Sequence, residues 1–258
     1  MITFTQKGNN PFYVIGCLLK SVHFLTKKQL RKFILIPIFI NLLLYSLAFG
    51  LAFIYKDDLT AFLLPDWIES ISWLRWLSKI IGGLIFISIL IITFFTFTIL
   101  ANLIASPFYD KLSARTLELL IERDTPVGQT PQMPERLTDE SWLKNLQGEW
   151  QRIRYLLLWA IFLLIFSLIP VINLIAPLLW GIFGAWGMAL EYLAYPLDNR
   201  GLRFPEQKKL VQSVRLGALT FGGVSLLGLT IPFFNIVVSP LSVIAATIYT
   251  YGIENKSN

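Results

Sequence analysis

Four cations come directly before the first long uncharged stretch of the chain: Lys27, Lys28, Arg31 and Lys32. The stretch that follows, residues 33–55, is long enough to cross a membrane once as a helix. A helix start favours anions through its free N–H groups and dipole, and flanking cations add to this attraction. We therefore predict an anion-binding site at these four residues. Two other interpretations stay open, because such residues also bind anionic lipid head groups and orient membrane spans.

A second set of candidates lies at the ends of two later apolar runs. Asn102 lies toward the end of a neutral run, residues 80–108, and Asp110, Arg115 and Glu118 follow that run. Glu191, Asp198 and Arg200 follow the next apolar run. A helix facing lipid gains nothing from such groups, so we predict that they line a pathway inside the protein. The alternatives are an interfacial exit with a proline kink for the first group and a surface ion-pair network for the second.

The sequence argues against an enzyme. Its single cysteine, Cys17, and single histidine, His23, leave no cluster of the kind that binds zinc, iron or haem. There is no phosphate-binding glycine loop, no nucleophile elbow and no nucleophile with an evident histidine partner. We expect no catalytic residue, no metal, no cofactor and no nucleic-acid partner.

Composition places the chain among integral membrane proteins. It is 55% apolar and only 15% charged, and its charges are confined to a few segments between long neutral runs. The expected elements, in chain order, are an amphipathic surface helix (12–32), a transmembrane helix (33–55), a polar connection (56–79), a long transmembrane helix (80–118), a cytoplasmic loop with an amphipathic helix (121–154), a first hairpin (155–190), a cytoplasmic connection (191–215) and a second hairpin (216–253). All belong to one membrane domain.

A short repeat marks the middle of each expected hairpin. Pro170 and Asn173 recur in the same spacing as Pro232 and Asn235, each pair halfway along a neutral run. The arms on either side would be roughly 22 to 27 Å long as helices, against about 30 Å of hydrocarbon. We therefore predict re-entrant hairpins that turn inside the membrane, with the asparagine side chains satisfying the backbone of the turns. Ordinary tight loops at the far surface remain the alternative.

The fold predicted is thus all-α, with two long transmembrane helices, two re-entrant hairpins and amphipathic surface helices. Its orientation follows from charge. Only three of the 22 Lys and Arg residues lie in the connection 56–79. Because cytoplasmic loops are enriched in Lys and Arg, we predict that this connection is extracytoplasmic and that both termini are cytoplasmic.

Three motifs resemble a known family. They are NLIASPFYDKL at 102–112 followed by Glu118, WGMALEYLAYPLDN at 186–199, and LRKFILIP at 30–37 with Asn41. Together they resemble the bacterial sulfate transporter CysZ family over nearly the whole chain. The resemblance implies an inner-membrane protein that admits sulfate for assimilation into cysteine, without hydrolysing nucleotides. It also implies two long transmembrane helices, two partly inserted hairpins and a homo-oligomer.

The resemblance further implies a sulfate site at the first membrane entry, where the family has a pair of arginines. The matching residues here are Arg31 and Lys32, and a lysine lacks the planar fork that grips an oxyanion with two bonds. Lys27 and Lys28 can supplement the charge.

Two functions of different class follow from these observations. The first is a channel-like permease for sulfate, with sulfite and related oxyanions as further substrates. The second is a membrane-shaping or scaffold protein whose interfacial helices bind lipids. For the first we expect a homo-oligomer, because a closed polar path across the hydrocarbon needs several helices and one chain offers only two long ones.

Overall fold

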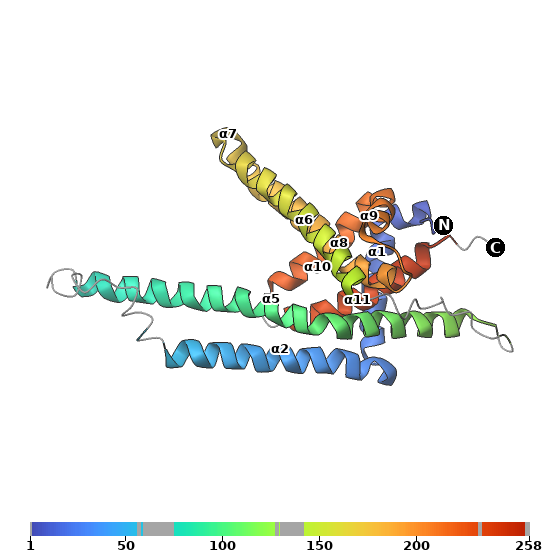
Figure 1. The fold of residues 1–258 in the computed structure, drawn as a ribbon, viewed down its shortest axis with the longest axis horizontal. Helices are drawn as coiled ribbons and strands as arrows, with labels where there is room; N and C mark the ends of the chain where they lie inside the picture. The colour runs from blue at the N-terminus through green and yellow to red at the C-terminus, as the bar shows by residue number, and fades with distance from the viewer. Residues whose placement is uncertain are drawn as a thin grey trace. The chain divides into compact units, whose positions relative to one another are not determined.

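The computed structural model describes residues 2–55, 58, 75–126, 129, 142–231 and 234–255. In these residues every regular element is a helix, apart from one antiparallel bridge between Phe4 and Glu254 (Figure 1). The chain forms two compact units, one of Met1–Ile34 with Phe108–Asn258 and the other of Leu35–Pro107. The prediction of an all-α protein is confirmed. Most of the predicted connection 56–79 lies outside the described residues.

Helix α1 (Pro11–Leu25) starts at an asparagine cap followed by proline, as the sequence indicates. The Asn10 side chain accepts a hydrogen bond from the Phe12 N–H at 2.9 Å, and Pro11 takes the first position, where no N–H partner is needed. The buried face of α1, which includes Val14 and Cys17, packs against α10 (Arg215–Thr230) and α11 (Asn235–Ile253). The short 3-10 helix η1 (Gln6–Asn9) precedes α1.

Helix α2 (Lys28–Ile54) begins earlier than the predicted residue 33, so the boundary between the first two helices lies at Thr26 and Lys27. The reason is burial: Leu30 and Ile34 are both covered, which favours helix upstream of the uncharged run. Pro37 therefore lies inside α2 rather than in its first turns, and it removes one hydrogen bond from the helix.

The unit Leu35–Pro107 contains the apolar parts of α2 and α5 (Arg75–Asp124). On α2 only a narrow face is covered, and it carries Asn41, Ala48 and Ala52, whose spacing of seven and four residues places them on one side of the helix. Leucines around the rest of α2 are exposed, as expected of a helix surrounded by lipid. Helix α5 contains the predicted long helix 80–118 and extends beyond it at both ends.

The first hairpin consists of α6 (Trp142–Ser167), the single-turn helix α7 (Pro170–Asn173) and α8 (Ala176–Asp198). Its arms run past the predicted limits 155–190, because α6 takes in most of the segment predicted as a separate amphipathic helix and α8 continues to Asp198. The Trp180 indole donates to the Ser167 hydroxyl at 3.2 Å and joins the arms near the tip. At the tip, the apolar side chains of Val171 and Leu174 are strongly exposed.

The second hairpin consists of α10 and α11, preceded by α9 (Phe204–Ser213), which meets α10 at an angle of 103°. Most side chains of helix α11 are buried, and the helix packs against α1, α8 and α10 (Figure 1). The N-terminal segment reaches this hairpin too, since Asn9 Oδ1 accepts a hydrogen bond from the Leu216 N–H at 2.8 Å and so caps α10.

Helices α8 and α10 cross at very short range. A Cβ atom placed on Gly222 would lie 1.8 Å from the carbonyl oxygen of Ala185, so only glycine fits at this crossing. By contrast, the neighbouring Gly223 meets nothing closer than 3.8 Å. Gly222 therefore serves packing within the chain.

Three helical segments among the described residues are long and apolar enough to cross a membrane: Arg31–Ile54, Gly148–Ser167 and Asn235–Ile253. The bent pair α9 and α10 is a fourth candidate if it counts as one broken span. In α5 the described stretch Ile80–Thr93 is apolar as well. The number of complete spans and the re-entrant nature of the hairpins stay predictions.

Candidate functional site

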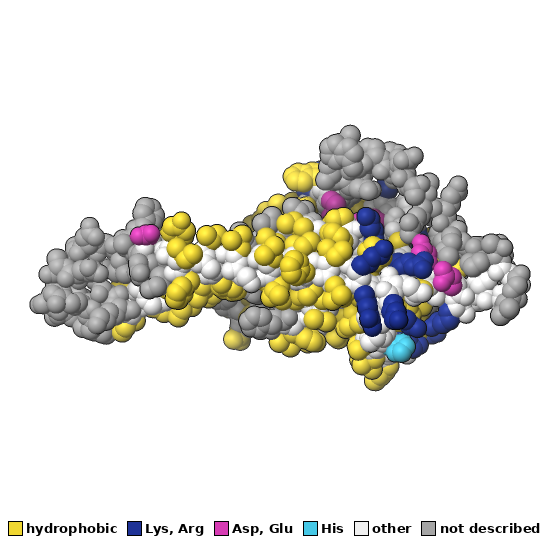
Figure 2. All heavy atoms as spheres, turned by 90° about the horizontal axis from the view of Figure 1, so that it is seen from below, with side chains coloured by type: hydrophobic (Ala, Val, Ile, Leu, Met, Phe, Trp, Pro, Cys, Tyr) yellow, Lys and Arg dark blue, Asp and Glu magenta, His cyan; other side chains and the backbone are white. Residues whose placement is uncertain are grey.

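The predicted anion site, which we call the basic segment, lies where α1 meets α2. All four of its side chains, those of Lys27, Lys28, Arg31 and Lys32, are exposed. Figure 2 shows Lys and Arg side chains gathered in a band on one face of the protein.

Within the basic segment, the two residues expected to bind sulfate point to different neighbours. Arg31 Nη2 lies 3.5 Å from the Thr26 carbonyl oxygen, and Lys32 Nζ lies 5.2 Å from the centre of the Phe33 ring. Both residues belong to the first two turns of α2, next to its free N–H groups. The arrangement can attract an anion and offers backbone donors to it.

The two long motifs at 102–112 and 186–199 meet in space. The Asn199 side chain donates to the Asp110 carbonyl oxygen at 3.3 Å, and the rings of Tyr109 and Tyr195 lie edge to face with centres 5.9 Å apart. Residues far apart in the sequence thus join the C-terminal third of α5 to the C-terminal end of α8. The sequence alone did not predict this contact.

Arg152 lies at the centre of this region, although it was not among the predicted site residues. It projects from α6, its side chain is only 10% exposed, and it pairs with Glu149 on its own helix and with Glu191 on α8 at 3.2 Å. One signal in the sequence is that Arg152 stands one turn before an uncharged run of α6. A charge so close to a span is rarely left without a partner.

Asp198 completes the group. Gln207 on α9, itself buried, donates from Nε2 to Asp198 Oδ1 at 2.5 Å and to the Leu202 carbonyl oxygen at 2.7 Å. Burial raises the pKa of Asp198 to about 7; the carboxylates of Asp110 and Glu149 act in the same direction, whereas Gln207 and Arg152 oppose it.

We call Asp110, Glu149, Arg152, Glu191 and Asp198 the charge cluster. It has four carboxyl groups for one guanidinium, so it carries excess negative charge whenever the acids are ionised. Such a group holds helices together and repels an anion. The structure therefore brings together three predicted pathway residues, Asp110, Glu191 and Asp198, around an arginine that the prediction missed.

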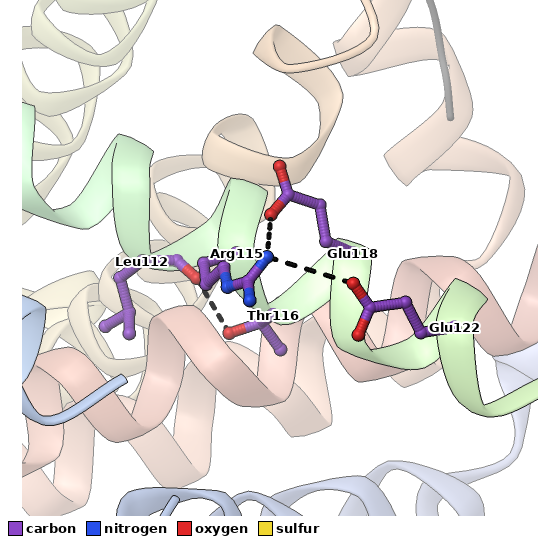
Figure 3. Close-up of polar contacts among 5 residues, drawn as sticks. All are labelled: Leu112, Arg115, Thr116, Glu118 and Glu122. Carbon is purple, nitrogen blue, oxygen red and sulfur yellow. Dashed lines mark hydrogen bonds and ion pairs between the residues drawn. The ribbon is translucent and has the colours of Figure 1, made fainter. Parts of the chain in front are cut away.

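Other predicted residues lie apart from the cluster. Arg200 pairs with Glu254 at 2.6 Å, with a side chain 6% exposed, and burial lowers its pKa below the ordinary value despite this partner. Arg115 lies along α5 with Glu118 at 2.6 Å and Glu122 at 3.9 Å (Figure 3). The side chain of Asn102 lies outside the described part of the structure.

The hairpin turns differ from each other. Asn173 is exposed at the tip of the first hairpin, beside Pro170. Asn235 in the second is buried, and its Oδ1 accepts no hydrogen bond from the described residues. The predicted bonding of this side chain to the turn stays a prediction, because most of that turn lies outside the described residues. Helix α11 starts at Asn235 itself, and the Asn235 backbone N–H donates to the Ile231 carbonyl oxygen at 3.1 Å. Pro232 lies outside the described residues.

Helix α11 also carries buried hydroxyl groups, each bonded to a different neighbouring helix. Ser239 accepts from Tyr192 on α8 at 3.3 Å, Ser242 donates to Ser225 on α10 at 3.1 Å, and Thr247 lies 2.9 Å from the Ser113 hydroxyl on α5. These bonds fix the central helix. Among the described residues, no group of three or more His, Cys, Asp or Glu side chains is placed to hold a metal ion.

Comparisons with known proteins agree with the motifs. A family model described as "Sulfate transporter CysZ/Etoposide-induced protein 2.4" matches residues 17–240. A sulfate transporter CysZ of Pseudomonas aeruginosa is 34% identical over 234 residues, which cover 89% of this chain and 91% of that protein. One from Pseudomonas syringae pv. tomato is 35% identical over 232 residues, covering 85% and 84%. The matched range includes both the basic segment and the charge cluster.

Proposed function

The chain belongs to the family Sulfate transporter CysZ/Etoposide-induced protein 2.4, and from this membership we propose that it is a channel-like sulfate permease of the bacterial inner membrane. The observation that carries the proposal is near full-length similarity to proteins named sulfate transporter CysZ. The apolar helices agree with it, and the protein is a membrane protein. Sulfate would enter for assimilation into cysteine; sulfite and related oxyanions are further candidate substrates.

We place the first sulfate contact at the basic segment. Sulfate carries two charges and is costly to dehydrate, so a site near the membrane must replace water with cations and oriented N–H groups. Arg31 and Lys32 lie near the start of α2, where cationic side chains and oriented backbone N–H groups are both available. Lys27 and Lys28 add charge. Because these side chains are exposed, the site suits capture of an ion that is soon released.

The charge cluster has a different role in this proposal. Its excess of carboxyl groups opposes sulfate binding. We therefore assign it a structural role: Asp110, Glu191 and Asp198 surround Arg152, and these interactions act as a clamp that fixes the position of the first hairpin. A path for sulfate then runs beside this clamp. We propose cytoplasmic termini from the distribution of Lys and Arg. We also propose a homo-oligomer, because we predict only two long transmembrane helices in each chain.

Flux of radiolabelled sulfate into liposomes containing the purified protein tests the function. We expect uptake well above that of protein-free vesicles. Uptake no faster than in protein-free vesicles would favour the alternative, a membrane-shaping or scaffold protein.

The position of the site is tested by a charge reversal. Arg31→Glu should lower sulfate binding and flux at least tenfold more than Lys20→Glu, since a charge-assisted contact contributes about 1.5 to 3 kcal/mol. Lys20 is a matched control because it is also an exposed cation, on the neighbouring helix α1. Equal effects would indicate only a change of surface potential and would remove the proposed site.

A further inference from the structure

Helix α1 has an uncovered apolar face. Its members recur at three- and four-residue spacing, and they are strongly exposed: Phe12 83%, Ile15 40%, Leu19 68% and Val22 50%. The opposite face, with Val14 and Cys17, is buried against the protein. An amphipathic helix that is covered on one side and apolar on the other needs a second apolar environment.

The position of α1 along the chain identifies that environment. Thr26 and Lys27 alone separate α1 from α2, and two residues span at most about 7 Å. Helix α2 includes a candidate membrane span that begins at Arg31. The C-terminal end of α1 is therefore held at the membrane surface, where its apolar face meets the outer part of the acyl chains.

Within the described residues, the lysines next to this face form no ion pair. No Asp or Glu occurs in the sequence before Asp57, and none of the ion pairs in the described part of the chain includes Lys20, Lys27 or Lys28. Exposed cations beside an interfacial helix attract anionic lipid head groups, and each contributes to the binding. The lysines therefore favour anionic over neutral lipids. The apolar face alone would not distinguish the two.

We infer that the apolar face of α1, together with Lys27 and Lys28, forms a binding surface for anionic phospholipids. The apolar side chains enter the interface and the lysines contact the phosphates. This surface fixes the depth of α1 and so the height at which Arg31 is presented. The inference rests on the membrane location and not on the identity of the transported ion.

Native mass spectrometry of the detergent-purified full chain tests the lipid preference. The protein is equilibrated with equal amounts of phosphatidylglycerol and phosphatidylcholine that carry the same acyl chains. We expect phosphatidylglycerol to be retained preferentially, and Lys27→Gln with Lys28→Gln to lower that preference about tenfold. The control, Lys209→Gln with Arg215→Gln, removes two exposed cations from α9 and α10 and should leave the preference unchanged. No preference in the wild type, or equal loss in both variants, would overturn the inference.

A second measurement tests the apolar face. A nitroxide at Leu19→Cys in a Cys17→Ser background, in bilayers containing phosphatidylglycerol, should be relaxed by oxygen and protected from a water-soluble nickel complex. A label that is freely accessible to nickel would contradict insertion of this face. Neither measurement uses sulfate, so failure here is distinct from failure of the transport proposal.

Discussion

Arg152 on α6 and Glu191 on α8 form an ion pair with an N–O distance of 3.2 Å, which joins the two arms at the base of the first hairpin. The Arg152 side chain is 10% exposed and that of Glu191 is 38% exposed. Glu149 pairs with the same guanidinium. One arginine thus neutralises carboxylates from both arms.

Replacing this arginine should destabilise the protein. Arg152→Met leaves the carboxylates of Glu149 and Glu191 without a countercharge, and we expect a loss of about 2 kcal/mol, below the cost of breaking a fully buried pair because Glu191 is partly hydrated. Thermal unfolding in detergent measures the loss. Adding Glu191→Gln should restore part of it; a double variant less stable than Arg152→Met would contradict the pairing.

The stability of the protein should depend on pH through Asp198. Its pKa in the folded protein is raised to about 7 by burial, whereas an Asp in an unfolded chain has a pKa of about 4. The folded state therefore binds this proton more readily than the unfolded chain does. The resulting contribution to stability is fully present below about pH 4 and is lost as the pH rises through 7.

Asp198→Asn isolates this contribution. Asparagine keeps an oxygen that accepts the Gln207 hydrogen bond but does not titrate, so the variant should lose less stability than the wild type between pH 5 and pH 8. Asp198 keeps exposed surface, and solvent screening makes the difference modest. Melting temperatures across this range provide the measurement. Parallel profiles would show that Asp198 does not carry the effect.

Features that depend on residues close together in the sequence could be predicted, whereas those that depend on residues far apart could not. The start of α1 was predictable, because Asn10 and Pro11 act within one turn. The start of α2 was not, because it depends on the burial of Leu30, which no local motif indicates. Arg152 was missed for the same reason: its partner Glu191 lies on another helix, and only the folded hairpin brings them together.

The crossing of α8 and α10 should tolerate no side chain at Gly222. Gly222→Ala places a Cβ 1.8 Å from the Ala185 carbonyl oxygen, so the helices must separate, and we expect a loss of about 3 kcal/mol. Gly223→Ala is the matched control, because its Cβ would meet nothing nearer than 3.8 Å. The yield of monodisperse protein and its melting temperature report both effects. Equal stability of the two variants would show that the crossing is not tight.

The tip of the first hairpin should lie within the membrane. Val171 is 84% exposed and Leu174 87%, and an uncovered apolar tip of this kind is unfavourable in water. A single cysteine at Val171, in a Cys17→Ser background, should therefore resist a membrane-impermeant maleimide added from the extracytoplasmic side, and should react once detergent dissolves the membrane. Phe234, 51% exposed next to the second turn, should behave in the same way.

Lys209→Cys provides the control for this labelling. Lys209 is exposed on α9, outside the hairpins, and on the proposed cytoplasmic side it should react rapidly in inside-out vesicles. Rapid reaction of Val171→Cys from the extracytoplasmic side of intact cells would instead place the tip at the far surface. The arms of the first hairpin would then be complete spans. If Val171→Cys is protected and Phe234→Cys reacts, only the first hairpin is re-entrant. The two turns differ in a way that would explain this result, because the apolar tip of the first hairpin is exposed whereas Asn235 in the second is buried.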